Sequence, residues 1–275
     1  MNRVKIKKIV KIVLVGIVAL SFIACENNQT TNKKEVKYTA SLPIPESGKL
    51  REMGLVGLWY DAKKDPITAT KIGYAYSEEL KDYDKAIKWY KYSNSMKPTG
   101  TNSNYMCYAY QMKKDYETAI KWCKNAIDLG NKEVYTNLGD MYFNMKKYDK
   151  SIAVYEEGYK KTKNTDLLTN IAYIYDEKKK NYKTAEEWYK KASTKGNMKA
   201  YQGLSYLYFS KLDKKIKSSA YAIALIENKY SKNSVIKILK ERNFSNETIK
   251  KGYELQLNSD EFPIKYKGKL GLDDE

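Results

Sequence analysis

Residues 82–90, with the sequence DYDKAIKWY, recur along the chain in slightly altered form. The related stretches are 115–123 (DYETAIKWC), 147–155 (KYDKSIAVY) and 181–189 (NYKTAEEWY). Their small residues, Ala86, Ala119, Ser151 and Ala185, are separated by 33, 32 and 34 positions. Within the first copy the apolar residues fall at i, i+3, i+4 and i+7, which is one face of an α-helix. The chain therefore contains an amphipathic helix repeated at a nearly constant period.

A second apolar segment precedes each copy by about a dozen residues, a length that fits one more helix per repeat. These segments are centred on Ile72-Gly73, Met106-Cys107, Leu138-Gly139 and Ile171-Ala172. A small residue at this position lets two antiparallel helices approach closely, with the facing alanine or serine doing the same. Each repeat is thus predicted to be a helical hairpin. A single hairpin cannot bury both of its faces, so neighbouring hairpins must stack to form a core.

This pattern of Leu-Gly, tyrosine, alanine and aromatic positions resembles tetratricopeptide repeats. The runs 121–126 (KWCKNA) and 187–197 (EWYKKASTKGN) resemble the related Sel1-like variant. The resemblance extends from about Ile67 to Tyr208, and a fifth unit begins at Ala200 with an irregular second helix within 213–227. It implies an all-α fold, a right-handed α-solenoid of about five stacked helical hairpins, with the repeat array at 67–232.

The segments on either side of the array are predicted to cover its ends, because an open solenoid terminus would expose its core. Residues 48–66, which include the apolar run 50–61, are expected to form an N-terminal capping helix. Residues 233–257 are expected to form two C-terminal capping helices, with Ser245 or Asn246 as the N-cap of the second. The tail 258–275 is expected to be loosely held.

The N-terminal residues are typical of an export signal, because a basic start is followed by an uncharged run over 12–24 that ends at Cys25. A bilayer-spanning helix needs about 18 to 20 apolar residues, so a transmembrane helix is the weaker interpretation. Ala24 before Cys25 resembles the lipobox of bacterial lipoproteins, although Phe22 stands where that family usually has leucine. The alternative is a cysteine that merely ends an apolar run.

The lipobox resemblance implies a signal peptide at 1–24, acylation of Cys25 and a place in the cell envelope, anchored to a membrane on the periplasmic or surface side. The polar stretch 25–47 would then be a flexible tether. The chain has 51 basic and 33 acidic residues, a net charge of +18. Such a charge favours anionic envelope polymers, lipid headgroups or acidic proteins. Nucleic acid is not expected as a partner of an exported protein.

Catalytic signatures are missing from the sequence, which contains no histidine. Triads that need histidine and the usual zinc ligand sets are therefore excluded. No glycine-rich phosphate loop occurs either. The carboxylate pairs, Glu156-Glu157, Glu186-Glu187 and Asp273-Asp274, lie among lysines on faces expected to be solvated. We expect no enzyme, cofactor or metal, the alternative being an accessory or enzymatic role on peptidoglycan or another cell-wall glycan.

Cys107 and Cys123 lie on the two helices of one hairpin, both on the side expected to pack. In an oxidising envelope they could form a disulfide that joins these helices. The alternative, which we favour, is two buried thiols that behave as small apolar residues.

Candidate partner-binding residues follow the small contact residue of each first helix by one position. The resemblance implies that they project towards the concave surface of the array. They are Tyr74, Tyr108, Asp140 and Tyr173, with Asn104, Asn137 and Asn170 nearby. In tetratricopeptide repeats an asparagine two residues before the small residue often hydrogen-bonds a ligand's backbone. Asn137 and Asn170 match that position, whereas Lys71, Tyr105 and Tyr201 depart from it.

The preferred hypothesis is an envelope lipoprotein that binds a peptide or a partner's helix in the concave groove of the array, as an adaptor or assembly scaffold. The candidate residues would otherwise be ordinary surface positions, and the chain a purely architectural spacer.

Overall fold

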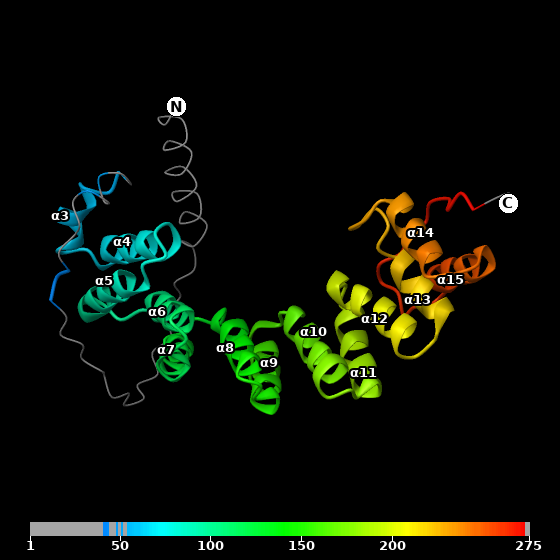
Figure 1. The fold of residues 1–275 in the computed structure, drawn as a ribbon, viewed down its shortest axis with the longest axis horizontal. Coiled ribbons are helices and arrows are strands. Elements are labelled where there is room, and N and C mark those ends of the chain that lie inside the picture. The colour runs from blue at the N-terminus through cyan, green and yellow to red at the C-terminus, as the bar shows by residue number, and fades with distance from the viewer. Residues whose placement is uncertain (1–40, 44–47, 49–50, 52–53, 273–275) are drawn as a thin grey trace. The chain divides into compact units, whose positions relative to one another are not determined.

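The structure is a computed structural model that describes residues 41–43, 48, 51 and 54–272. Within these ranges it contains thirteen α-helices, α3 to α15, one π-helical turn and no β-strand (Figure 1). The predicted all-α fold of stacked helical hairpins is confirmed. The predicted signal peptide 1–24, Cys25 and most of the tether 25–47 lie outside the described residues.

The chain divides into two compact units, residues 1–131 (unit 1) and 132–275 (unit 2). In unit 1, α4 pairs with α5 and α6 pairs with α7 as hairpins, α5 packs on α6, and the short helix α3 packs on α4. The bounds are α3 Leu58–Ala62, α4 Pro66–Glu78, α5 Tyr83–Met96, α6 Gly100–Met112 and α7 Tyr116–Asp128.

Unit 2 contains three hairpins, formed by α8 with α9, α10 with α11, and α12 with α13. A π-helical turn, η1, continues α10, and α14 and α15 pack on α13. The bounds are α8 Val134–Asn144, α9 Tyr148–Thr162, α10 Asp166–Tyr173, η1 Ile174–Lys178, α11 Tyr182–Ser193, α12 Met198–Ser210, α13 Lys215–Ile223, α14 Lys232–Glu241 and α15 Asn246–Asn258.

The first residue of the repeated stretch is the N-cap of the second helix in three hairpins. Asp82, Asp115 and Asn181 each accept a hydrogen bond on the side chain from a first-turn amide, at 3.1, 3.2 and 3.1 Å. Such a cap satisfies a backbone donor that has no partner within the helix. In α9 this position is Lys147, which makes no side-chain cap.

In the first and third hairpins the small residue of the first helix makes room for a ring from the second helix. A Cβ added to Gly73 would lie 2.7 Å from the ring of Tyr90, and one added to Gly139 would lie 2.1 Å from the ring of Tyr155. Any larger side chain would therefore force the helices apart. The close approach inferred from the sequence is thus made chiefly by a tyrosine lying across a glycine.

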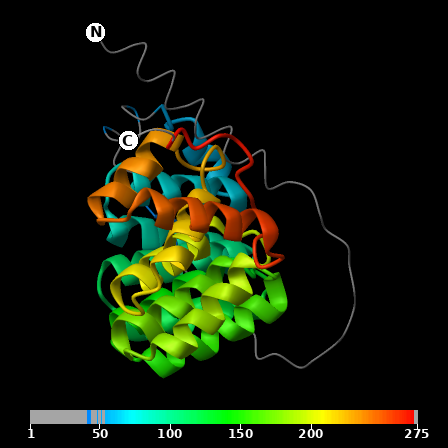
Figure 2. The ribbon, with the colours of Figure 1, turned by 90° about the vertical axis from the view of Figure 1, so that its right-hand side faces the viewer.

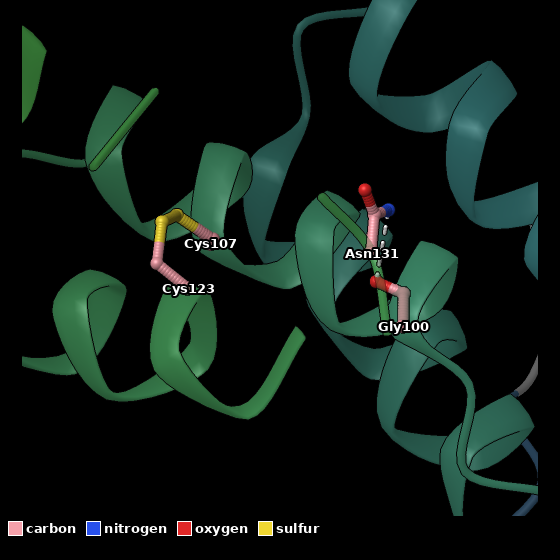
Figure 3. The surroundings of a disulfide bond; sticks show 4 residues. All are labelled: Gly100, Cys107, Cys123 and Asn131. Carbon is pink, nitrogen blue, oxygen red and sulfur yellow. Dashed lines mark hydrogen bonds between the residues drawn. A yellow bond between two sulfur atoms is a disulfide. The ribbon is translucent and has the colours of Figure 1, made fainter. Parts of the chain in front are cut away.

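The second hairpin uses a disulfide at this same place, where Cys107 of α6 and Cys123 of α7 replace the glycine and the tyrosine (Figure 3). Their Cα atoms are 5.1 Å apart and both residues are fully buried. The preference for two free thiols was therefore wrong for this structure. The same hairpin is closed at its other end by Asn131, whose side-chain amide donates to the carbonyl of Gly100 at 3.3 Å.

In the fifth hairpin Ser205 occupies the contact position of the first helix. Ser218 donates to the carbonyl of Ser205 at 2.8 Å, just as Ser151 donates to the carbonyl of Gly139 at 2.8 Å. Gly203 instead accommodates the preceding hairpin, because a Cβ there would lie 2.4 Å from the ring of Tyr189.

The C-terminal segment is not loosely held, contrary to the prediction for 258–275. Residues 259–272 return along α15, as the red chain in Figure 2 shows. The side chain of Gln256 makes two hydrogen bonds with the backbone of Tyr266, at 2.8 and 3.0 Å, and Phe262 is 1% exposed. Phe262 packs at 4.6 Å from the ring of Tyr221, so this segment completes the core at the end of unit 2.

The second capping helix begins as predicted, with Ser245 as its N-cap. The hydroxyl oxygen of Ser245 accepts a hydrogen bond from the amide of Thr248 at 3.1 Å.

Candidate partner-binding surface

The seven predicted partner-binding residues all lie on first helices of hairpins. Unit 1 holds Tyr74, Asn104 and Tyr108, and unit 2 holds Asn137, Asp140, Asn170 and Tyr173. All are half-buried except Tyr173, which is 44% exposed.

In unit 1 the structure brings Tyr74 into a cluster of rings. Tyr74 of α4 lies edge-on to Tyr105 of α6 at 5.4 Å, and Tyr105 stacks on Tyr90 of α5 at 5.5 Å. Tyr90 is buried, and this burial raises the pKa of its hydroxyl. Such ring contacts stabilise packing beyond the area they bury. Tyr74 therefore supports the contact between consecutive first helices, whether or not it also meets a partner.

Tyr108 contacts a different ring, that of Tyr83 in α5, at 6.3 Å. Partial burial raises the pKa of Tyr108, and the nearby charge of Glu78 adds to the effect. Asn104, one turn earlier on α6, is already engaged in an interaction within the protein. This part of the chain thus offers aromatic surface rather than free amides.

In unit 2 a buried tyrosine joins two of the predicted residues. The hydroxyl of Tyr155 in α9 donates to the carboxylate of Asp140 in α8 and also hydrogen-bonds the side chain of Asn170 in α10. Burial raises the pKa of Tyr155, and the Asp140 carboxylate raises it further, so the phenol keeps its proton. The sequence did not predict this network, which ties two consecutive first helices together.

The network leaves part of Asn170 available to a ligand. A side-chain amide has two N–H donors and a carbonyl oxygen, and Tyr155 does not use all of them. Asn137 is also engaged within the protein. In unit 2 only α8 and α10 carry an asparagine two residues before the small contact residue. On α12 the contact residue is Ser205, so Gly203 takes this position, not Tyr201 as the sequence suggested.

Tyr173, which is exposed, forms an aromatic patch with half-buried Phe143, which the sequence did not single out. Its ring lies 5.9 Å from that of Phe143, and the ammonium group of Lys178 lies 5.5 Å from Phe143 and 6.0 Å from Tyr173. Phe143 is three residues after Asp140 on α8, and continuing that helix face by one turn would have found it. We call Asn137, Asp140, Phe143, Asn170 and Tyr173 the first-helix surface of unit 2.

Two of the carboxylates considered as catalytic candidates, Glu157 and Glu186, have structural partners. Glu157 accepts a hydrogen bond from Tyr135 at 2.9 Å. Glu186 accepts one from Tyr208 at 2.8 Å and lies 3.0 Å from the ammonium group of Lys190. Burial acts to raise the pKa of Glu186, but these two donors outweigh it and the pKa is lowered. Asp273 and Asp274 lie outside the described residues.

The described residues offer no group of three or more acidic or cysteine side chains placed to hold a metal ion. None of the described helices combines the length and apolar character needed to cross a lipid bilayer.

Family comparisons agree with this architecture. Residues 79–158 match the family of anaphase-promoting complex, cyclosome, subunit 3, residues 165–194 match a tetratricopeptide repeat and residues 57–96 match a Sel1 repeat. The chain is a tetratricopeptide- and Sel1-like repeat protein. Repeats of these families are typically non-catalytic scaffolds that mediate protein–protein interaction. The Sel1 match falls on the first hairpin. The runs 121–126 and 187–197, which resemble that variant in sequence, lie outside the match.

Similarity to solved structures concerns the fold alone. A structure described as a functional characterisation of Pseudomonas aeruginosa pilF is 16% identical, with a TM-score of 0.50, over 71% of this chain and 88% of that chain. A Sel1 repeat protein from Oxalobacter formigenes is 21% identical, with a TM-score of 0.43, over 82% of this chain and 89% of that chain. No curated protein matches the sequence.

Proposed function

We propose that this chain is a lipid-anchored envelope protein that binds a peptide segment of a partner through the first-helix surface of unit 2, as an adaptor or assembly scaffold. The general role in protein–protein interaction follows from the repeats themselves. The observation that carries the specific proposal is the network of Asp140, Tyr155 and Asn170. It holds a carboxylate and an amide in fixed positions on consecutive first helices, which also carry the exposed ring of Tyr173.

An amide held in this way suits the backbone of an extended peptide. Such a peptide loses water from its N–H and C=O groups on binding, and each needs a new partner. Asn170 keeps one N–H donor and its carbonyl oxygen for a ligand, because the Tyr155 hydroxyl donates to Asp140 and accepts from the other N–H. Because Tyr155 already holds its side chain, less rotamer entropy is lost on binding, where ordering a free side chain costs roughly 0.5 to 1.5 kcal/mol. The affinity of Asn170 for a peptide backbone is correspondingly greater.

The patch of Tyr173 and Phe143 supplies the apolar part of the surface. Aromatic side chains bury a large area with few rotatable bonds, which is why they dominate the binding energy of many interfaces. Lys178 places a positive charge over both rings, so an acidic residue in the partner would be favoured next to them.

The membrane anchor is proposed from the sequence. The uncharged run at 12–24 before Cys25 supports export and acylation. Without the five basic residues of 1–24, the anchored chain would keep 46 basic and 33 acidic residues, a net charge of +13, which would add long-range attraction to anionic lipid headgroups or envelope polymers.

Capture of partners from native membranes tests the first-helix surface. The wild-type chain, the double variant Asn170→Ala/Tyr173→Ala and the control Tyr60→Ala serve as baits, and the bound proteins are identified by mass spectrometry. Tyr60 is 67% exposed and lies in α3 of unit 1, so it controls for loss of a surface ring. We expect at least one protein that binds the wild type and the control but is depleted with the double variant. Equal recovery with all three baits would contradict the assignment of this surface.

Lipidation is tested separately with Cys25→Ser. The variant should lose the mass of the acyl groups and move from the membrane fraction to the soluble fraction. A membrane fraction unchanged by this substitution would contradict the lipid anchor and leave the partner surface untouched.

A further inference from the structure

A small pocket lies at the end of unit 2, away from the residues of the first-helix surface in sequence. It opens between α12, α13, the turn that follows α13, and α14, and its volume is about 120 Å³. Its lining is Gln202, Ser205, Ala222, Leu225, Tyr230, Val235, Ile238 and Arg242. Half of these side chains are aliphatic, so the pocket combines an apolar wall with a few polar groups.

Arg242 is the charged residue of this pocket, and among the described residues it has no acidic counterpart. It follows the last turn of α14, it is half-buried, and its guanidinium group lies 4.8 Å from the ring of Phe209. One guanidinium nitrogen donates to the hydroxyl of Ser205 at 3.3 Å. Burial lowers the pKa of Arg242, and no described carboxylate opposes the effect. The guanidinium nevertheless stays charged, because its pKa lies far above neutrality in any protein environment.

Another half-buried cation of unit 2, unlike Arg242, has acidic partners. Lys190 is also half-buried, but it lies between two carboxylates, 3.0 Å from Glu186 and 3.1 Å from Glu261. Removing a charge from water costs free energy unless an opposite charge or hydrogen bonds replace the water. Lys190 receives that compensation within the fold. Arg242 keeps most of its five N–H groups for a ligand.

The remaining polar groups of the pocket also favour an anion. Lys229 donates to the side-chain oxygen of Gln202 at 2.6 Å, which brings a second positive charge to the rim. The amide nitrogen of Gln202 in turn contacts the hydroxyl of Tyr230. A guanidinium group binds carboxylates or phosphates through two parallel hydrogen bonds. The wall formed by Val235 and Ile238 favours an anion that carries an aliphatic group. A carboxylate attached to an aliphatic carbon meets both requirements.

The size of the pocket narrows the ligand further. Pockets that enclose a whole drug-sized molecule measure about 300 to 1,000 Å³, whereas this one measures about 120 Å³. It holds one end group of a larger ligand. The last residue of a peptide carries its carboxylate and its side chain on the same Cα, so both can enter together.

We propose that the pocket at Arg242 binds the C-terminal carboxylate of a partner chain that ends in an aliphatic residue. The guanidinium group of Arg242 holds the carboxylate, and Val235 and Ile238 hold the last side chain. This site is independent of the first-helix surface and would give the protein a second point of attachment.

Fluorescence anisotropy of short labelled peptides tests the proposal on the purified full chain. The first probe is fluorescein-Gly-Ser-Gly-Ser-Gly-Leu with a free carboxylate, and the second is the same peptide with a C-terminal amide. The third probe is amidated and carries aspartate as its fifth residue. A hydrogen bond to a charged group contributes about 1.5 to 3 kcal/mol, so amidation should weaken binding by about tenfold or more. Saturable binding of the first probe alone supports the proposal.

Variants of the protein locate the site. Arg242→Gln should weaken the first probe as much as amidation does, and Arg242→Lys should give an intermediate affinity because it keeps the charge but loses the paired donors. Lys240→Gln, an exposed change in the last turn of the same helix, should leave the affinity within about twofold, since exposed charges contribute little. Tyr173→Ala should also leave it unchanged, which separates this site from the first-helix surface.

Four results would overturn the proposal. They are no saturable binding of the free-carboxylate peptide, equal binding of its amide, equal binding of the amidated aspartate peptide, and an affinity that Arg242→Lys leaves at the wild-type value. The first three results come from the unaltered protein, so they remain decisive even if Arg242→Gln fails to fold.

Discussion

Asp176 provides a test of the energetics of unit 2, because it is a buried carboxylate with little compensation. It lies in the π-helical turn η1, it is 3% exposed, and its Oδ1 atom has no hydrogen-bond partner among the described residues. Burial raises the pKa of Asp176 and the charge of Glu177 raises it further, while Lys211 and Lys180 oppose them. Burial therefore opposes ionisation of this carboxyl group in the folded protein.

Replacing Asp176 by asparagine should stabilise the protein at pH 7. The side chain keeps its shape and loses its charge, and an unsatisfied buried polar group costs about 1 to 3 kcal/mol, more when it is charged. An amide leaves part of that cost in place, so we expect Asp176→Asn to raise the free energy of unfolding by about 1 to 2 kcal/mol. This corresponds to a rise in Tm of about 2 to 8 °C.

The effect should depend on pH in a defined direction. The pKa of Asp176 is higher in the folded than in the unfolded state, so protonation favours the folded protein. Below the unfolded pKa of about 4 the carboxyl group is protonated in both states, so the wild type pays no cost for burying its charge. This cost in folding free energy grows as the pH rises through the folded pKa. The advantage of Asp176→Asn should therefore be larger at pH 7 than near pH 4.

Thermal and chemical unfolding followed by circular dichroism at both pH values measure this difference. Asp260→Asn is the matched control, because it makes the same chemical change at an exposed site of unit 2, and its effect should be near zero. The reasoning would be refuted if Asp176→Asn lowered stability at pH 7, or if its effect were the same at pH 4.

Three further predictions concern the hairpins. Cys107→Ser, or reduction of the disulfide with Cys123, should lower the free energy of unfolding by about 3 kcal/mol, the value for a loop of this length, in a denaturant titration with and without reductant. Gly139→Ala should cost about 1 to 3 kcal/mol in the same titration, because its Cβ would fall 2.1 Å from the ring of Tyr155. Lys146→Gly should raise the Tm, with a gain of about 1 kcal/mol, because residue 146 has a positive φ of 58° that glycine adopts without strain.

Much of the fold followed from the sequence because its information is periodic. The small residues at 86, 119, 151 and 185 fix the spacing of the hairpins, and the aspartate or asparagine that opens three of the four stretches fixes where their second helices begin. Ser245 was predicted as a cap for the same local reason. Each of these features depends on residues within one or two helical turns of each other.

The features that were missed depend on contacts between distant residues. Phe262 and Tyr266 belong to no repeat, so nothing in their spacing indicated that they complete the core beside α13 and α15. Arg242 meets Ser205 across 37 positions of sequence, and a single arginine after a capping helix gives no sign of a pocket. The disulfide required the distance between two Cα atoms, which the sequence does not contain.

One position of the repeat joins the packing of the fold to the proposed function. In three hairpins the tyrosine of the second helix (Tyr90, Tyr155 or Tyr189) packs against the next first helix, two residues before its small contact residue, and meets Tyr105, Asn170 or Gly203 there. The tyrosine ring packed against this position therefore limits which residue can occupy it. At Asn170 the tyrosine hydroxyl fixes an amide that still has a donor to offer, whereas at Gly203 the ring of Tyr189 fills the space where a side chain would stand. On the proposed function, this limits the peptide-binding amides of unit 2 to α8 and α10 and makes their orientation a consequence of how the hairpins pack.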